Sequence, residues 1–262
     1  TVTNVPNGAL LRDNDVVFDD IRGVEQIVYQ ASSGTVDLTM SLNAENAGIH
    51  EISVTGTYTT SIIHVEGYNN GVKVETDAGQ DSIFGSFYAD TLLSGGGNDY
   101  IFDGGGRAND YIDAGEGDNT VLAGDGNQTI VSGNGADNIN AGSGNDSIIG
   151  GSGTNTITLN GGVDTVDLSK SAAKADVVTI ASASGLDATA SKFVAITGFT
   201  NALSTSVGDK LDVLNTGTVV ADASNVATGI TNLTASITKG IVTFGGSAAA
   251  TATLANLVSA VF

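Results

Sequence analysis

The chain has 262 residues, with 29 acidic against 9 basic side chains and a formal net charge of −20. This charge disfavours a nucleic-acid partner, because phosphates would be repelled. Without cysteine there is neither a disulfide framework nor thiol chemistry, and no apolar stretch is long enough to predict membrane insertion. With 36 Gly, one Pro and no Trp, the composition indicates a thin-cored all-β protein rather than a compact α/β enzyme.

Residues 1–75 contain short β-branched runs separated by Gly and Asn. The runs are Ile27–Tyr29, Val36–Met40, Ile49–Val54, Ile62–Val65 and Val72–Val74. Val74 and Val65 precede Ile83 by nine and eighteen residues, so we expect metal-free solenoid rungs, with a separate small β sandwich as the alternative. His50 and His64 are the only histidines. We expect structural or surface roles for them, and a shared zinc site is the alternative.

Residues 76–167 repeat every nine residues. An aliphatic residue recurs at Ile83, Leu92, Ile101, Ile112, Val121, Ile130, Ile139, Ile148, Ile157 and Val166, with one step of eleven between Ile101 and Ile112. Two positions earlier stands an oxygen-bearing side chain: Asp81, Asp90, Asp99, Asp110, Asn119, Gln128, Asp137, Asp146, Asn155 and Asp164. This is the pattern G-G-x-G-x-D-x-U-x, where U is aliphatic.

Each nine-residue unit predicts a Gly- and Asx-rich turn followed by a very short strand with one inward aliphatic residue. One unit cannot bury that residue alone, whereas stacked units form a continuous core, which is the principle of a solenoid. Stacking also brings Asp carboxylates together beside backbone carbonyls. Calcium prefers six to eight such oxygen ligands, so we expect metal binding and folding to be linked. The alternative is a solenoid that uses Asp and Asn only for turn geometry.

These units resemble the RTX (repeats-in-toxin) calcium-binding repeats of bacterial proteins exported by type I secretion. The resemblance implies a parallel β-roll, a β-solenoid with two nonapeptides per turn and several Ca²⁺ ions bound in its turns by Asp side chains and Gly-region carbonyls. One side would stack Asp81, Asp99, Asn119, Asp137 and Asn155, and the other Asp90, Asp110, Gln128, Asp146 and Asp164. Carbonyls would come from turns containing Gly97, Gly117, Gly135 and Gly144.

Several positions depart from the repeat. Asn119, Gln128 and Asn155 keep a carbonyl oxygen but lose the charge, so sites that include them should be weaker or empty. Tyr88 replaces the last Gly of its turn, and a two-residue insertion at Arg107 and Ala108 should make the following turn bulge. The Asp146–Asp164 site is therefore expected to be more regular than the Asp90–Asp110 site.

Residues 168–262 lose Asp and Gly and gain Ala, Thr, Ser and Val. Val194–Phe199 and Gly208–Val213 are similar to two strands that follow the repeats in RTX proteins, and we expect a β-rich cap or assembly region that covers the last rung. Thr253–Phe262 predicts a short helix. It is either part of a carboxyl-terminal secretion signal or a truncation point, and the lack of an initiator Met suggests a fragment of a longer protein.

The sequence contains no H-E-x-x-H, G-x-S-x-G or Walker motif, so we expect no catalytic residues and no enzymatic activity. The favoured function is a calcium-dependent structural protein of the bacterial cell surface, a surface-layer (S-layer) protein that self-associates in a lattice or oligomer. A cell-surface glycan could be bound by regions outside the chain. The alternatives are the RTX tail of a secreted enzyme or toxin, and the extender or cap of an adhesin.

Overall fold

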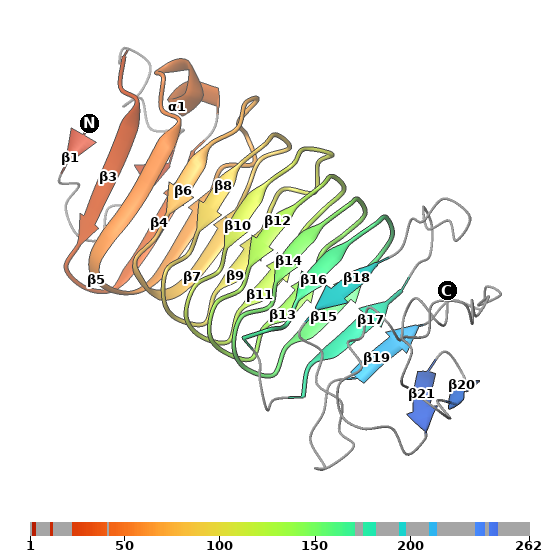
Figure 1. Cartoon of the computed structure of the whole chain (residues 1–262). Helices are drawn as coiled ribbons and strands as arrows, with labels where there is room; N and C mark the ends of the chain where they lie inside the picture. Colours follow the sequence, from red (N-terminus) through yellow and green to blue (C-terminus); the bar gives the residue numbers. More distant parts are fainter. Residues whose placement is uncertain are drawn as a thin grey trace.

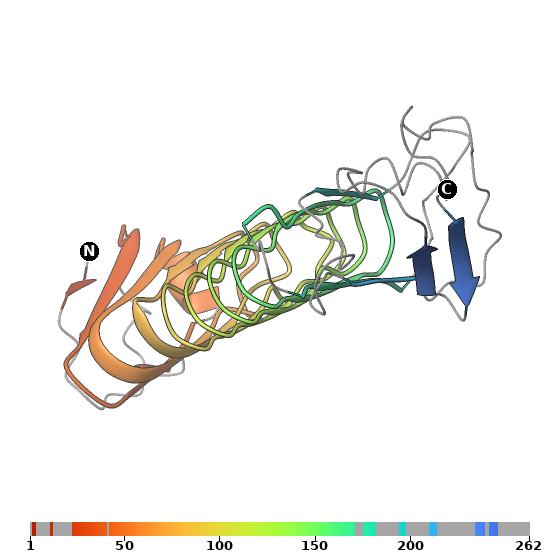
Figure 2. The ribbon, with the colours of Figure 1, turned by 60° about the horizontal axis from the view of Figure 1, so that its bottom comes forward.

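The computed structural model describes residues 2–3, 11–12, 23–40, 42–170, 175–181, 194–197, 210–213, 234–238 and 241–245. The strands from β1 (Val2–Thr3) to β19 (Lys210–Val213) form an elongated coil of parallel strands, with β1 near one end and β19 near the other (Figure 1). Successive coils stack along the long axis (Figure 2). The architecture is all-β, a β-solenoid of the β-roll type, as the nine-residue period predicts.

Each coil contributes one strand to each of two sheets. The first sheet contains β1, β3 (Gln26–Ala31), the first part of β5 (Glu51–His64), β6 (Lys73–Glu75), β8 (Thr91–Leu93), β10 (Tyr111–Asp113), β12 (Thr129–Val131), β14 (Ser147–Ile149), β16 (Thr165–Asp167) and β18 (Ala195–Thr197). The second contains β2 (Leu11–Arg12), β4 (Thr35–Thr39), the rest of β5, β7 (Ala78–Phe84), β9 (Tyr100–Phe102), β11 (Thr120–Leu122), β13 (Asn138–Asn140), β15 (Thr156–Leu159), β17 (Val177–Ile180) and β19. All these pairings are parallel.

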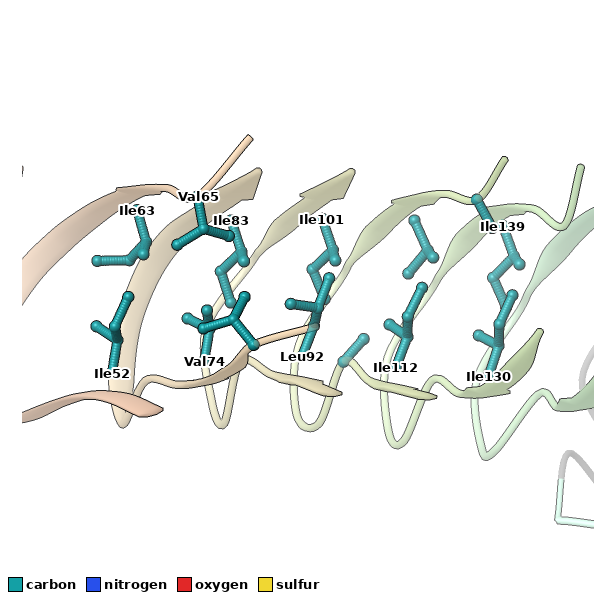
Figure 3. Packing of buried hydrophobic residues seen from close by; sticks show 14 of the residues in the cluster. Ile52, Ile63, Val65, Val74, Ile83, Leu92, Ile101, Ile112, Ile130 and Ile139 are labelled. Atoms are coloured by element: carbon teal, nitrogen blue, oxygen red, sulfur yellow. The ribbon is translucent and has the colours of Figure 1, made fainter. Parts of the chain in front are cut away.

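Two rows of aliphatic side chains fill the interior (Figure 3). In the first sheet the row is Ile27, Ile52, Val74, Leu92, Ile112, Ile130, Ile148, Val166 and Ile196. In the second it is Leu38, Ile63, Ile83, Ile101, Val121, Ile139, Ile157 and Val178. Every member is at most 2% exposed, so each contributes roughly 1.5–3 kcal/mol of burial free energy. All ten aliphatic residues of the repeat lie in these rows, as predicted.

Both sheets continue across residues 75 and 167, because β6 pairs with β8 and β16 pairs with β18. Toward the amino terminus, two of the expected strand runs are one continuous strand, β5, which bends from the first sheet into the second near Gly56. Gly56 has φ +110°, and a Cβ there would lie 2.1 Å from the Ala31 carbonyl oxygen. A short helix, α1 (Leu42–Asn46), lies in the connection between β4 and β5 and was not predicted.

The prediction for Val65 is wrong by two residues. Ile63, not Val65, pairs with Ile83. The two extra residues lie in the connection from β5 to β6, because Ile63 and Val74 are eleven residues apart instead of nine. Val65 is nevertheless fully buried, and its backbone N–H donates to the Phe84 carbonyl at 2.9 Å.

After the repeats, the two segments singled out by the sequence do form strands. β18 and β19 pair in parallel with β16 and β17, so they extend both sheets. β20 (Thr234–Thr238) and β21 (Ile241–Gly245) form an antiparallel pair, and β21 also pairs with β19. The helix expected over Thr253–Phe262 lies outside the described residues.

Candidate metal centres

The oxygen-bearing residues of the repeat stack in two rows, which we call the first and second ladders. The first ladder contains Asp81, Asp99, Asn119, Asp137, Asn155 and Asp176, and the second contains Asp90, Asp110, Gln128, Asp146 and Asp164. In each ladder a side-chain oxygen accepts the backbone N–H of the ladder residue one coil earlier, over 2.6–3.0 Å. The structure therefore brings together the neighbours that the repeat spacing predicts, and every ladder residue is at most 5% exposed.

This hydrogen bond uses only one carboxylate oxygen. The second oxygen, Oδ2, is buried without a hydrogen-bond partner in Asp99, Asp137 and Asp146. A buried acceptor without a partner costs about 1–3 kcal/mol, and a buried charge costs more. These turns therefore require either a proton or a cation beside the carboxylates.

The raised pKa values of the carboxyl groups also indicate that these turns require a proton or a cation. Burial raises the pKa of Asp110 and Asp146 to about 7, and neighbouring carboxylates contribute to the rise. Burial also raises the pKa to about 6 in Asp99, Asp137 and Asp164. Ordinary Asp ionises near pH 4, so neutralisation by a bound cation would relieve the cost of ionising these groups at neutral pH.

The three Asp–Asp neighbours differ in how well their oxygens are satisfied. Asp81 receives a hydrogen bond from the Tyr58 hydroxyl at 3.2 Å. Asp90 receives two from Ser86 in its own turn, from N–H at 2.6 Å and from Oγ at 2.9 Å. Asp146 Oδ1 accepts the backbone N–H of Gln128, whereas its Oδ2 has no hydrogen-bond partner. The Asp146–Asp164 pair is therefore the one with the greatest unmet need for a cation.

The predicted glycines lie where adjacent turns approach most closely. Gly97, Gly117, Gly135 and Gly144 all have positive φ, between 108° and 144°. A Cβ on each would lie 1.5, 1.9, 2.0 and 1.7 Å, respectively, from a Gly carbonyl oxygen of the preceding coil. Glycine thus allows carbonyl oxygens to line the space beside the ladders, where they are available to a metal ion.

Sequence reasoning missed two buried acids in or beside the ladders. Asp103 stands at the first position of the irregular turn, and its two oxygens accept the N–H groups of Gly105 at 2.8 Å and Gly124 at 2.7 Å. Its charge contributes to the raised pKa of Asp110. Asp176 extends the first ladder, because its Oδ1 accepts the Asn155 N–H at 2.6 Å. Asp103 stands two residues after an aliphatic residue of the repeat, not two before it, and Asp176 lies 21 residues after Asn155, so the pattern of ladder residues gave no signal for them.

The donor set fits a hard, oxygen-seeking cation such as calcium, which binds carboxylates and backbone carbonyls. Within the described ranges, no three His, Cys, Asp or Glu side chains converge as a metal-ligand cluster. The set offered by the turns is therefore carboxylate pairs supplemented by backbone carbonyls. His64 packs against Phe84 with ring centroids 4.5 Å apart, and its Nδ1 lies 3.0 Å from Glu66 Oε1.

The fold and its turns define a class: a parallel β-roll with rows of buried carboxylates facing backbone carbonyls. A family model described as the RTX calcium-binding nonapeptide repeat (four copies) matches residues 75–107, 104–130 and 131–166. The middle of the chain is therefore made of RTX calcium-binding repeats. Searches of the curated proteins and of the solved structures found no match. In the described part of the chain, no helix has the length and apolar character needed to cross a bilayer.

Proposed function

We propose that this chain is a structural, non-catalytic protein of the bacterial cell surface, an S-layer component that folds and self-associates on calcium binding after type I secretion. The observation that carries the proposal is the pair of ladders. Buried carboxylates are stacked coil upon coil, and several have an oxygen that no protein group satisfies. Calcium at extracellular, roughly millimolar levels would saturate sites of the affinity given for extracellular modules, about 10⁻⁴–10⁻³ M.

Self-association is supported by the outer surface. The outward positions of the first sheet stack as Thr91, Tyr111, Thr129, Ser147 and Thr165, a regular row of mostly small polar side chains. Such a row gives a repetitive face suited to contacts between copies. A net charge of −20 would keep copies apart, and bound calcium would reduce that repulsion.

The test is a calcium titration of the purified chain, followed by circular dichroism and then by light scattering, with magnesium as the control. Magnesium demands a near-ideal octahedral site and dehydrates reluctantly, so we expect calcium, and not magnesium, to increase the β structure and its stability against urea. Growth of sheets or particles at higher calcium would support the lattice role. Folding without any assembly would favour the enzyme-tail or adhesin role, and a chain insensitive to calcium would contradict calcium-dependent folding altogether.

A further inference from the structure

Three ladder positions carry an amide instead of a carboxylate: Asn119, Gln128 and Asn155. Their side-chain oxygens accept the backbone N–H of the preceding ladder residue at 2.9, 2.6 and 3.0 Å, as the Asp carboxylates do. A backbone N–H can only donate, so the amide oxygen must face it. The –NH₂ group is therefore fixed on the opposite side, where a carboxylate would place its second oxygen.

Each of these –NH₂ groups donates to backbone carbonyl oxygens of the turns. Asn119 Nδ2 lies 3.0 Å from the Gly117 oxygen, and Asn155 Nδ2 lies 2.7 Å from the Gly150 oxygen. Gln128 Nε2 lies 3.2 Å from two carbonyl oxygens, one in its own turn and one in the preceding coil. The amide positions are thus satisfied on both sides by the protein itself.

The carboxylate positions differ on that same side. Asp99, Asp137 and Asp146 each have a buried Oδ2 without a hydrogen-bond partner. A carboxylate oxygen and a carbonyl oxygen are both acceptors, so only a group with positive character can bridge them. At the amide positions, the –NH₂ group takes the place of the second carboxylate oxygen and donates directly to the carbonyl oxygens, so no bridging cation is needed.

From these contacts we infer that Asn119, Gln128 and Asn155 act as built-in replacements for the cation and determine which turns take up calcium. The inference rests on the proposed calcium-dependent folding and specifies where it acts. Turns with an amide hold their carbonyls together without metal, whereas turns with only carboxylates require it.

The two ladders would then differ in their need for calcium. In the first ladder, acids and amides alternate from Asp99 to Asp176, so Asp81 and Asp99 are its one pair of acids in adjacent coils. In the second ladder, Gln128 separates two pairs of acids in adjacent coils, about 4.8 Å apart. The second ladder therefore has two pairs of acids in adjacent coils against one in the first, so charge repulsion, and with it the requirement for calcium, is greater in the second ladder.

The test uses the full chain with Asn119→Asp, Asn119→Ala and the control Asn138→Asp. Asn138 is an exposed residue of β13, so its substitution adds the same charge on the outer face. Two quantities are measured for each variant: the urea midpoint in chelator and in calcium, and the number of calcium ions bound at equilibrium dialysis.

We expect Asn119→Asp to lower the urea midpoint in chelator, to recover it in calcium and to bind about one additional calcium ion. Asn119→Ala should lower the midpoint under both conditions, because it adds no ligand for calcium. The control should match the unsubstituted chain. The inference is overturned if Asn119→Asp behaves like the control, or if it stays unfolded in calcium.

A different result would contradict the proposed function. If the unsubstituted chain shows no calcium response, calcium-dependent folding is wrong. The chelator measurement still decides whether the amide of Asn119 stabilises its turn, because that comparison needs no calcium.

Discussion

Replacing Asp146 by Asn changes one oxygen into an –NH₂ group and leaves the size of the side chain unchanged. Asp146 Oδ1 accepts the Gln128 N–H at 2.9 Å, and the introduced amide can keep this bond. The Asp146 N–H donates to Asp164 Oδ1 at 2.9 Å and is unaffected. What changes is Oδ2, which is buried and has no partner.

Two costs set the expected change in the free energy of unfolding. Burial and neighbouring charges raise the pKa of Asp146 to about 7. At 1.36 kcal/mol per pKa unit this sets a ceiling of roughly 4 kcal/mol on the cost of ionisation at neutral pH, and relaxation and solvent screening reduce it. A buried polar atom without a partner independently costs about 1–3 kcal/mol. We therefore expect Asp146→Asn to raise the free energy of unfolding in chelator by about 1–3 kcal/mol.

The assay is urea unfolding at pH 7.5, in chelator and in saturating calcium. Calcium should stabilise Asp146→Asn less than it stabilises the unsubstituted chain, because the site has lost a charged ligand. The control is Asp125→Asn, which removes the same charge from an exposed turn position. An equal response of the two variants to calcium, or a loss of stability for Asp146→Asn in chelator, would refute this account of the carboxylate.

Three further predictions concern other parts of the β-roll. In chelator, the free energy of unfolding should be highest below about pH 4 and fall as pH rises to about 7, because the buried Asp carboxyls hold their protons more tightly in the folded state than in the unfolded state. In calcium the trend should reverse. Urea midpoints measured across this pH range check both. Gly97→Ala should lower the free energy of unfolding by about 3 kcal/mol or more with or without calcium, because the new Cβ would lie 1.5 Å from the Gly79 oxygen. Gly96→Ala is the control: its Cβ would have no atom closer than 3.9 Å, so the melting temperature should stay unchanged. Tyr58→Phe removes the hydroxyl that donates to Asp81 Oδ2; we expect a loss of about 1–3 kcal/mol in chelator, partly recovered in calcium, and an identical loss in both would contradict a metal role for Asp81.

The sequence predicts the core and the stacking of the ladders because a period of nine assigns every residue to one place in the coil. Ile112 falls into its row even though the step before it is eleven, because the two extra residues are accommodated in the turn before β10. The same period places Asp137 between Asn119 and Asn155. The metal-ligand roles of these residues stay predictions.

Structural features that lie outside the repeat pattern could not be predicted from the sequence. Asp103 and Asp176 join the buried acids from positions other than the Asp position of the repeat pattern. The position of Ile63 depends on two extra residues between Ile63 and Val74 that no local motif marks. The direction of the Asn119 amide depends on hydrogen-bond partners in two neighbouring coils, which the linear sequence does not show.

Because consecutive repeats belong to opposite ladders, the β-roll can change length only in certain steps. Corresponding residues of one ladder lie 18 residues apart in the regular coils, as Asp137 and Asn155 do. Insertion of two whole repeats would lengthen the rod by one strand spacing, about 4.8 Å, and leave the order within each ladder intact. Insertion of a single repeat would still match the aliphatic rows, but every downstream acid and amide would move to the other ladder. Duplications during evolution that preserve the calcium pattern should therefore come in pairs of repeats.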